Sequence, residues 1–159
     1  MLRDIVRGAI AGSVATWLMD QVTASMYSAQ PEDVTAGEAE ARPDGRSSAE
    51  NLVARFEEST GFELDEDMRA GVLRAIHYSL GAVPGALYVA LRRHVPLIGL
   101  GRGLPYGLLL FAVNDEWLNT TLGIAEPPEA YPVEARMRGL IGHLVLGGAT
   151  DTVADLLGG

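Results

Sequence analysis

Four uncharged, apolar and glycine-rich runs constrain the fold of this 159-residue chain more than any other feature. The runs cover residues 8–19, 78–91, 103–113 and 139–150. Each lies within a predicted helix of about 20 to 25 residues, long enough to cross the ~30 Å apolar core of a bilayer. Four such helices with short connections predict an all-α protein, namely a four-helix up-down bundle.

The predicted helices cover residues 3–27, 68–94, 99–122 and 134–157, and together they form a single domain over residues 1–159. Between the first two lies an extramembrane insert, residues 31–68. We expect a loop over residues 31–46, because Pro31 ends the first helix and further Pro and Gly residues follow. Ser47 and Glu50 have the spacing of a capping box and predict a short amphipathic helix that ends at Gly61.

The insert carries the whole net charge of −9, because it contains twelve acidic residues and three Arg. The rest of the chain is neutral, and no basic patch is available to hold phosphates. This composition excludes nucleic acid as a partner. The chain has no cysteine, which excludes disulfides, thiolate metal sites and cysteine nucleophiles.

An Arg-Gly pair is followed by an Asp at the same spacing in three of the four long helices. The three Arg–Asp sets are Arg7 with Asp20, Arg102 with Asp115, and Arg138 with Asp151. If the first and fourth helices are antiparallel, Arg7 lies level with Asp151 and Arg138 lies level with Asp20. We therefore predict structural ion pairs between these residues that fix the helix register.

Five polar residues of the long helices are candidates for a binding site: Asp20, His77, Asp115, Glu116 and His143. We expect them to converge in the non-cytoplasmic half of the bundle. A cluster of carboxylates and imidazoles there could bind a divalent cation or relay protons. The alternative is that each His is a hydrogen-bonded core residue and that the carboxylates only set the register.

No catalytic motif is recognisable in the sequence. The chain lacks a Glu-x-x-His pair of the ferritin-like kind, a His-Glu-x-x-His zinc motif, a Gly-x-Ser-x-Gly elbow and a P-loop. The pattern therefore favours a protein that is not an enzyme.

The distribution of charge in the connections favours a membrane protein. The uncharged runs are short enough for buried helices of a soluble four-helix bundle, which stays an alternative. Glycines inside helices, however, cost about 1 kcal/mol each in water. One side of the bundle has five Arg residues near the helix ends: Arg3, Arg7, Arg92, Arg93 and Arg102. The other side has the acidic insert with Glu126, Glu129 and Glu134, and Arg136 and Arg138 are the exception there. This asymmetry predicts a bacterial inner-membrane protein with both termini cytoplasmic.

Two segments also resemble a known family. Residues 11–20 (AGSVATWLMD) and 138–145 (RGLIGHLV) are similar to the YagU-type family of small uncharacterised bacterial inner-membrane proteins. The resemblance extends over all four predicted helices and implies a multi-helix membrane protein. It implies no established activity.

These observations leave two functional hypotheses. The first is a membrane-embedded binding or transport protein whose polar interior handles a cation or a proton. The second is a structural or assembly subunit whose glycine stripes pack against partner membrane helices or a second copy of the chain. In either case the lipid bilayer is the expected environment.

Overall fold

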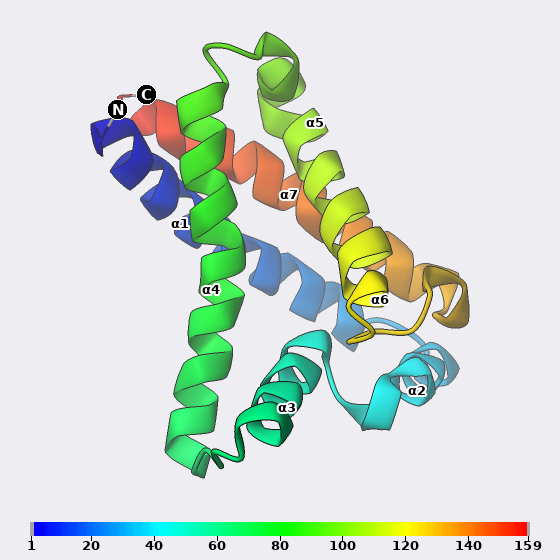
Figure 1. Ribbon diagram of the computed structural model, residues 1–159. Helices are drawn as coiled ribbons and strands as arrows, with labels where there is room; N and C mark the ends of the chain where they lie inside the picture. Colours follow the sequence, from blue (N-terminus) through cyan, green and yellow to red (C-terminus); the bar gives the residue numbers. More distant parts are fainter. Residues whose placement is uncertain (1, 159) are drawn as a thin grey trace.

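The computed structural model describes residues 2–158, and these residues form helices and connections without any β-strand (Figure 1). The all-α prediction is confirmed. Four segments provide the body of the protein: α1 (Leu2–Ser28), α4 (Glu66–Leu91), α5 (Leu100–Leu110) with its continuation, and α7 (Val133–Leu156). The insert between α1 and α4 contains α2 (Glu32–Ala41), a 3₁₀ turn (Pro43–Gly45) and α3 (Ser48–Thr60).

The long helices pack in the spatial order α4, α1, α7, α5. Helix α1 contacts both α4 and α7, whereas α5 packs mainly on α7. Figure 1 shows that α1 begins, α4 ends, α5 begins and α7 ends at one end of the molecule, and that α2 and α3 lie at the other end. Sequential long helices are therefore antiparallel.

Glycines bring the backbones of two helix pairs into direct contact. A Cβ added to Gly85 of α4 would lie 2.5 Å from the carbonyl oxygen of Gly8 on α1. A Cβ added to Gly103 of α5 would lie 2.6 Å from the carbonyl oxygen of Gly147 on α7. A Cβ at either crossing would force the two backbones apart, which explains why glycine occupies these positions despite its low helix propensity.

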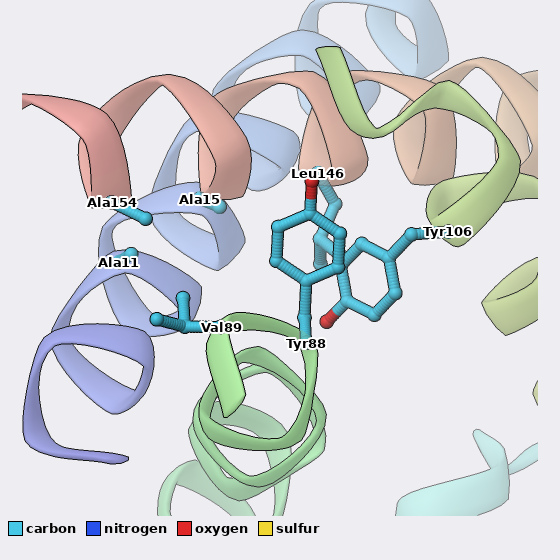
Figure 2. Packing of buried hydrophobic residues seen from close by; sticks show 7 residues of the cluster. All are labelled: Ala11, Ala15, Tyr88, Val89, Tyr106, Leu146 and Ala154. Carbon is cyan, nitrogen blue, oxygen red and sulfur yellow. The ribbon is translucent and has the colours of Figure 1, made fainter. Parts of the chain in front are cut away.

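Two stacked tyrosines separate α4 from α5. The rings of Tyr88 and Tyr106 have centroids 4.4 Å apart, and they pack beside Leu146 of α7 (Figure 2). The remaining core residues are small or branched, such as Ala11, Ala15 and Val89 (Figure 2). Large side chains thus fill the space between α4 and α5, whereas glycines close the α1–α4 and α5–α7 contacts.

The third long helix is irregular at both ends. Gly101, Arg102 and Gly103 all have positive φ, so regular α5 geometry starts only after Gly103. From Phe111 to Leu118 the helix widens into a π-helix, and α6 (Asn119–Thr121) follows it. A 3₁₀ turn, Pro96–Gly99, connects α4 to this helix.

The predicted loop over residues 31–46 is wrong, because most of it forms α2. Glu32 and Asp33 occupy the first turn of α2, where acidic side chains interact favourably with the positive end of the helix dipole. Gly37 does not break this helix but packs towards Pro132, whose Cγ would be 3.3 Å from a Cβ at that position. The capping box of Ser47 and Glu50 and the end of α3 at Gly61 are confirmed.

One helical segment, Pro96–Thr121, is long and apolar enough to cross a membrane by length and composition. Its best window has a mean hydropathy of 1.4, and 17% of that window is buried inside the protein. Within residues 2–158, no other helix is both long enough and apolar enough by the same measure.

Candidate functional site: a carboxylate–imidazole pair beside a polar cavity

The π-helix positions the polar residues at the end of the third long helix. The backbone N–H of Asn119 donates to the carbonyl oxygen of Asn114, five residues earlier, rather than four. The wider turn lets the consecutive residues Asp115 and Glu116 both reach α7. π-Helical turns of this kind occur frequently at functional sites.

Asp115 faces His143 of α7. Its Oδ2 lies 3.5 Å from Nδ1 of His143, and its Oδ1 accepts a hydrogen bond of 2.9 Å from the side-chain amide of Asn114. Nδ1 of His143 also lies 3.0 Å from the carbonyl oxygen of Gly139, so a proton on this nitrogen lies between a carbonyl and a carboxylate. The His143 ring is buried and contacts Phe111 edge-on, with 5.8 Å between the ring centroids.

Glu116 belongs to a different ion pair. Its two carboxylate oxygens accept hydrogen bonds from Nε and Nη2 of Arg136, at 3.3 and 2.7 Å. This two-point geometry holds the Glu116 carboxylate beside Asp115 without placing it on His143. Arg136 therefore balances the second acidic charge of the π-helix.

A cavity of about 340 Å³ opens beside these residues. Its walls come from α1, α2, the start of α3, the π-helix and the first turns of α7. Asp115, Glu116 and Arg136 line it together with Met19 and Thr23 of α1. The cavity therefore joins the polar end of the long helices to the acidic insert.

A buried carboxylate of the insert attaches α2 to the same end of α7. Glu38 accepts hydrogen bonds from Arg138 at 2.6 Å and from Arg42 at 2.8 Å. Burial raises the pKa of Glu38, but the hydrogen bonds and charges of Arg138 and Arg42 outweigh it and hold the pKa below its ordinary value. Arg138 also donates to Gln30 and lies over the ring of Tyr27.

Asp20 and His77 form a second, separate pair between α1 and α4. Nε2 of His77 lies 2.9 and 3.0 Å from the two carboxylate oxygens of Asp20. Both side chains are partly exposed, at 46% for His77 and 36% for Asp20. The expected convergence of all five candidates is therefore not found. Over residues 2–158, no three His, Asp or Glu side chains are grouped closely enough to hold a metal ion.

The predicted ion pairs between α1 and α7 are replaced by other pairs. Arg7 donates to the carbonyl oxygen of Gly158 at 2.6 Å and lies 4.0 Å from Asp4. Arg138 binds Glu38, as described above, and Asp20 binds His77. The expected pairs Arg7–Asp151 and Arg138–Asp20 are thus incorrect.

Asp151 instead lies in a buried network with α4 that the sequence reasoning did not find. Tyr88 and Arg92 donate to its Oδ1 at 2.6 and 2.7 Å, and Arg92 also donates to Asp155 at 2.9 Å. The donors are four residues apart on α4, and the acceptors are four residues apart on α7. Matching spacings on these two parallel helices were the available signal.

The candidate site is identified from this geometry alone. No protein-family model, no curated protein and no solved structure matches the chain.

Proposed function

We propose that the chain is an integral membrane protein of the bacterial inner membrane in which the Asp115–His143 pair binds and relays protons. The observation that carries the membrane assignment is the distribution of residue sizes. The α1–α4 and α5–α7 crossings consist of small residues, and apart from the Tyr88–Tyr106 cluster with Leu146 most large apolar side chains of the long helices are exposed. A water-soluble bundle has the opposite distribution, because it buries its large apolar side chains.

The outward apolar surface is extensive on α4 and on the third long helix. On α4, Leu80, Val83 and Leu87 are 50 to 59% exposed. The third long helix exposes a larger set at 40 to 64%: Leu97, Leu100, Leu104, Leu108, Leu109 and Val113. Lipid would cover these side chains, and it would leave packing between the helices to small residues.

The charges at the two ends support a defined orientation. The end formed by the start of α1 and the end of α4 contains Arg3, Arg7, Arg92 and Arg93. The opposite end contains the acidic insert (Figure 1). Because positive charge favours the cytoplasmic side of a membrane protein, this asymmetry supports an orientation with both termini in the cytoplasm. The resemblance to the YagU-type family carries the same expectation.

Proton handling is the chemistry that the Asp115–His143 pair supports best. Ionisable side chains within the apolar helices of membrane proteins are rare, and where they occur they often form proton relays. The pair adjoins a polar cavity on the side of the insert, from which protons could enter. A divalent cation is less well supported, because the described side chains supply only two acidic or imidazole groups at this point.

Purified protein in liposomes with a trapped pH-sensitive dye tests this proposal. We expect Asp115→Asn to remove half or more of the proton flux along an imposed pH gradient. Glu129→Gln, which removes the charge of an exposed carboxylate outside the cavity, is the matched control and should keep wild-type flux.

Wild-type flux through Asp115→Asn would sink the proton assignment and favour an assembly role. The membrane assignment has its own test. The protein should remain in the membrane pellet after alkaline carbonate extraction, and recovery as a soluble monomer would contradict it.

A further inference from the structure

Two helices of the protein share one sequence pattern, Arg-Gly-x3-Gly-x7-Asp. In α1 the pattern consists of Arg7, Gly8, Gly12 and Asp20, and in the third long helix it consists of Arg102, Gly103, Gly107 and Asp115. Both helices start at the same end of the molecule, so the two patterns are parallel (Figure 1). The Arg–Gly–Asp spacing in α7 lacks the second glycine, since Arg138 and Gly139 are followed by His143.

The two patterns also pack in the same way. A Cβ on Gly85 of α4 would meet the carbonyl oxygen of Gly8 and, at 2.9 Å, the Cα of Gly12. A Cβ on Gly147 of α7 would meet the carbonyl oxygen of Gly103 and, also at 2.9 Å, the Cα of Gly107. Gly85 and Gly147 therefore occupy equivalent positions on their helices.

The next turn of each crossing extends the correspondence. A Cβ on Gly12 would collide with the carbonyl oxygen of Gly81, and a Cβ on Gly107 would collide with the carbonyl oxygen of His143. Gly81 is thus equivalent to His143. One turn further from the crossing, His77 is equivalent to Gly139. The Asp at the end of each pattern faces this last turn.

We propose that the long helices are two copies of one helical-pair unit, α1–α4 and α5–α7, and that Asp20–His77 is a second proton-binding site equivalent to Asp115–His143. The assigned chemistry rests on the proposed function above. Parallel repeats of this kind, related by an axis along the membrane normal, recur in membrane transporters. Each unit would then carry protons through its own carboxylate–imidazole pair.

The two units differ in which turn of their second helix, α4 or α7, carries the His residue. In the first unit His77 lies directly opposite Asp20. In the second unit the imidazole is one turn closer to the crossing, at His143, and Gly139 lies opposite Asp115. A Cβ on Gly139 would lie 3.4 Å from Oδ2 of Asp115, so an imidazole placed there could reach the carboxylate.

The surroundings of the two pairs also differ. Tyr78, on α4 itself, packs edge-on against His77 with 5.5 Å between the ring centroids. Within the described residues, Asp20 has no ion-pair partner besides His77. Asp115 has Asn114 and Glu116 beside it on its own helix, and α7 adds Arg136 through Glu116. The Asp20 pair is therefore the simpler of the two sites.

Proton flux in liposomes tests the equivalence with three variants. Two units that act in parallel predict that Asp20→Asn and Asp115→Asn each remove about half of the flux, and that the double variant keeps less than a tenth. Wild-type flux in Asp20→Asn together with reduced flux in Asp115→Asn would overturn the second site and leave the proposed function intact. Wild-type flux in Asp115→Asn would overturn the proposed function itself. Complete loss in either single variant would overturn the independence of the two units.

Moving one imidazole tests the repeat directly. We expect His143→Ala to lower the flux as far as Asp115→Asn does, and Gly139→His added to His143→Ala to restore it. Gly139→Gln with His143→Ala is the matched control and should stay low. Failure of Gly139→His to restore flux in a folded, monodisperse protein would contradict the equivalence. If that variant does not fold, the three Asn variants decide alone.

Discussion

Tyr88 on α4 donates its phenolic hydrogen to Oδ1 of Asp151 on α7 over 2.6 Å. The two residues are both buried, and Arg92 forms an ion pair with the same carboxylate at 2.7 Å. This contact joins the end of α4 to the end of α7, where the two helices otherwise make few contacts. It is therefore a buried polar link between the α1–α4 and α5–α7 pairs, next to the ion pairs of Arg92 with Asp151 and Asp155.

The two stacked tyrosines should respond in opposite ways to loss of the hydroxyl. Tyr88→Phe leaves Asp151 with one donor fewer in a buried place and should lower the free energy of unfolding by about 1–3 kcal/mol. Tyr106→Phe removes a buried hydroxyl that has no hydrogen-bond partner in the described structure, so it should be neutral or stabilise by up to about 1 kcal/mol. Thermal unfolding in detergent, followed by circular dichroism, measures both. A loss in Tyr106→Phe equal to that in Tyr88→Phe would show that the Tyr106 hydroxyl has a partner.

The neighbouring arginines Arg92 and Arg93 should differ sharply. The Arg92 side chain is 13% exposed and pairs with Asp151, whereas the Arg93 side chain is 62% exposed. Arg92→Ala strands a buried carboxylate and should cost about 3–5 kcal/mol of stability, and Arg93→Ala should cost less than about 1 kcal/mol. Asp151→Asn combined with Arg92→Ala should cost less than the sum of the two, which a double-mutant cycle on thermal stability detects. Additive losses would mean that the two side chains do not interact.

Two glycines of α4 offer a matched pair for the crossing. Gly85→Ala places a Cβ 2.5 Å from the carbonyl oxygen of Gly8 and should destabilise the protein by about 1–3 kcal/mol. A Cβ at Gly71 meets nothing within 4 Å, so Gly71→Ala should stabilise the helix by up to about 1 kcal/mol. Melting temperatures of both variants in the same detergent check the contrast. Equal effects would contradict the close contact of α1 and α4.

Acid should weaken the attachment of α2 to α7 through Glu38. Its pKa in the folded protein lies below the ordinary value of 4.5, because the effect of Arg138 and Arg42 exceeds that of burial. The stabilising contribution is therefore fully present above the unfolded pKa and is lost as pH falls through the lower folded pKa. Protease sensitivity of the insert in wild type and Glu38→Gln should differ at pH 7, and the difference should shrink as pH falls from 4.5 through the lowered folded pKa of Glu38. A difference that persists at the lowest pH would assign the attachment to other groups.

Local signals in the sequence predict most of the helices. The apolar runs indicate the four long segments, and Ser47 with Glu50 marks the start of α3 correctly. Local signals failed for α2, because Pro31 and Gly37 suggest a loop whereas packing against Pro132 and acidic residues in the first turn favour a helix. The π-helix gives no signal in the sequence either, since it depends on how Asp115 and Glu116 meet α7.

The pairing of charges could be predicted only in part. His77 and His143 do each face an Asp, but the sequence could not show that the two pairs stay apart. The Arg-to-Asp spacing suggested that Arg7 reaches Asp151, whereas a closer donor, Arg92, occupies that carboxylate. The register between two helices depends on which glycines meet at their crossing. A shift of one helix by one turn would give each charged side chain a different partner.

The glycine crossings also determine how freely this chain could vary in sequence. At Gly12, Gly85, Gly107 and Gly147 an added methyl group would collide with backbone atoms, which cannot rotate away as a side chain can. If lipid covers the outward faces of α4 and α5, as proposed above, any large apolar residue would serve there equally well. A library of random variants selected for folded protein should therefore keep glycine at the crossings and exchange Leu, Ile, Val and Phe freely outside them. The information that specifies this fold would then lie in its smallest residues.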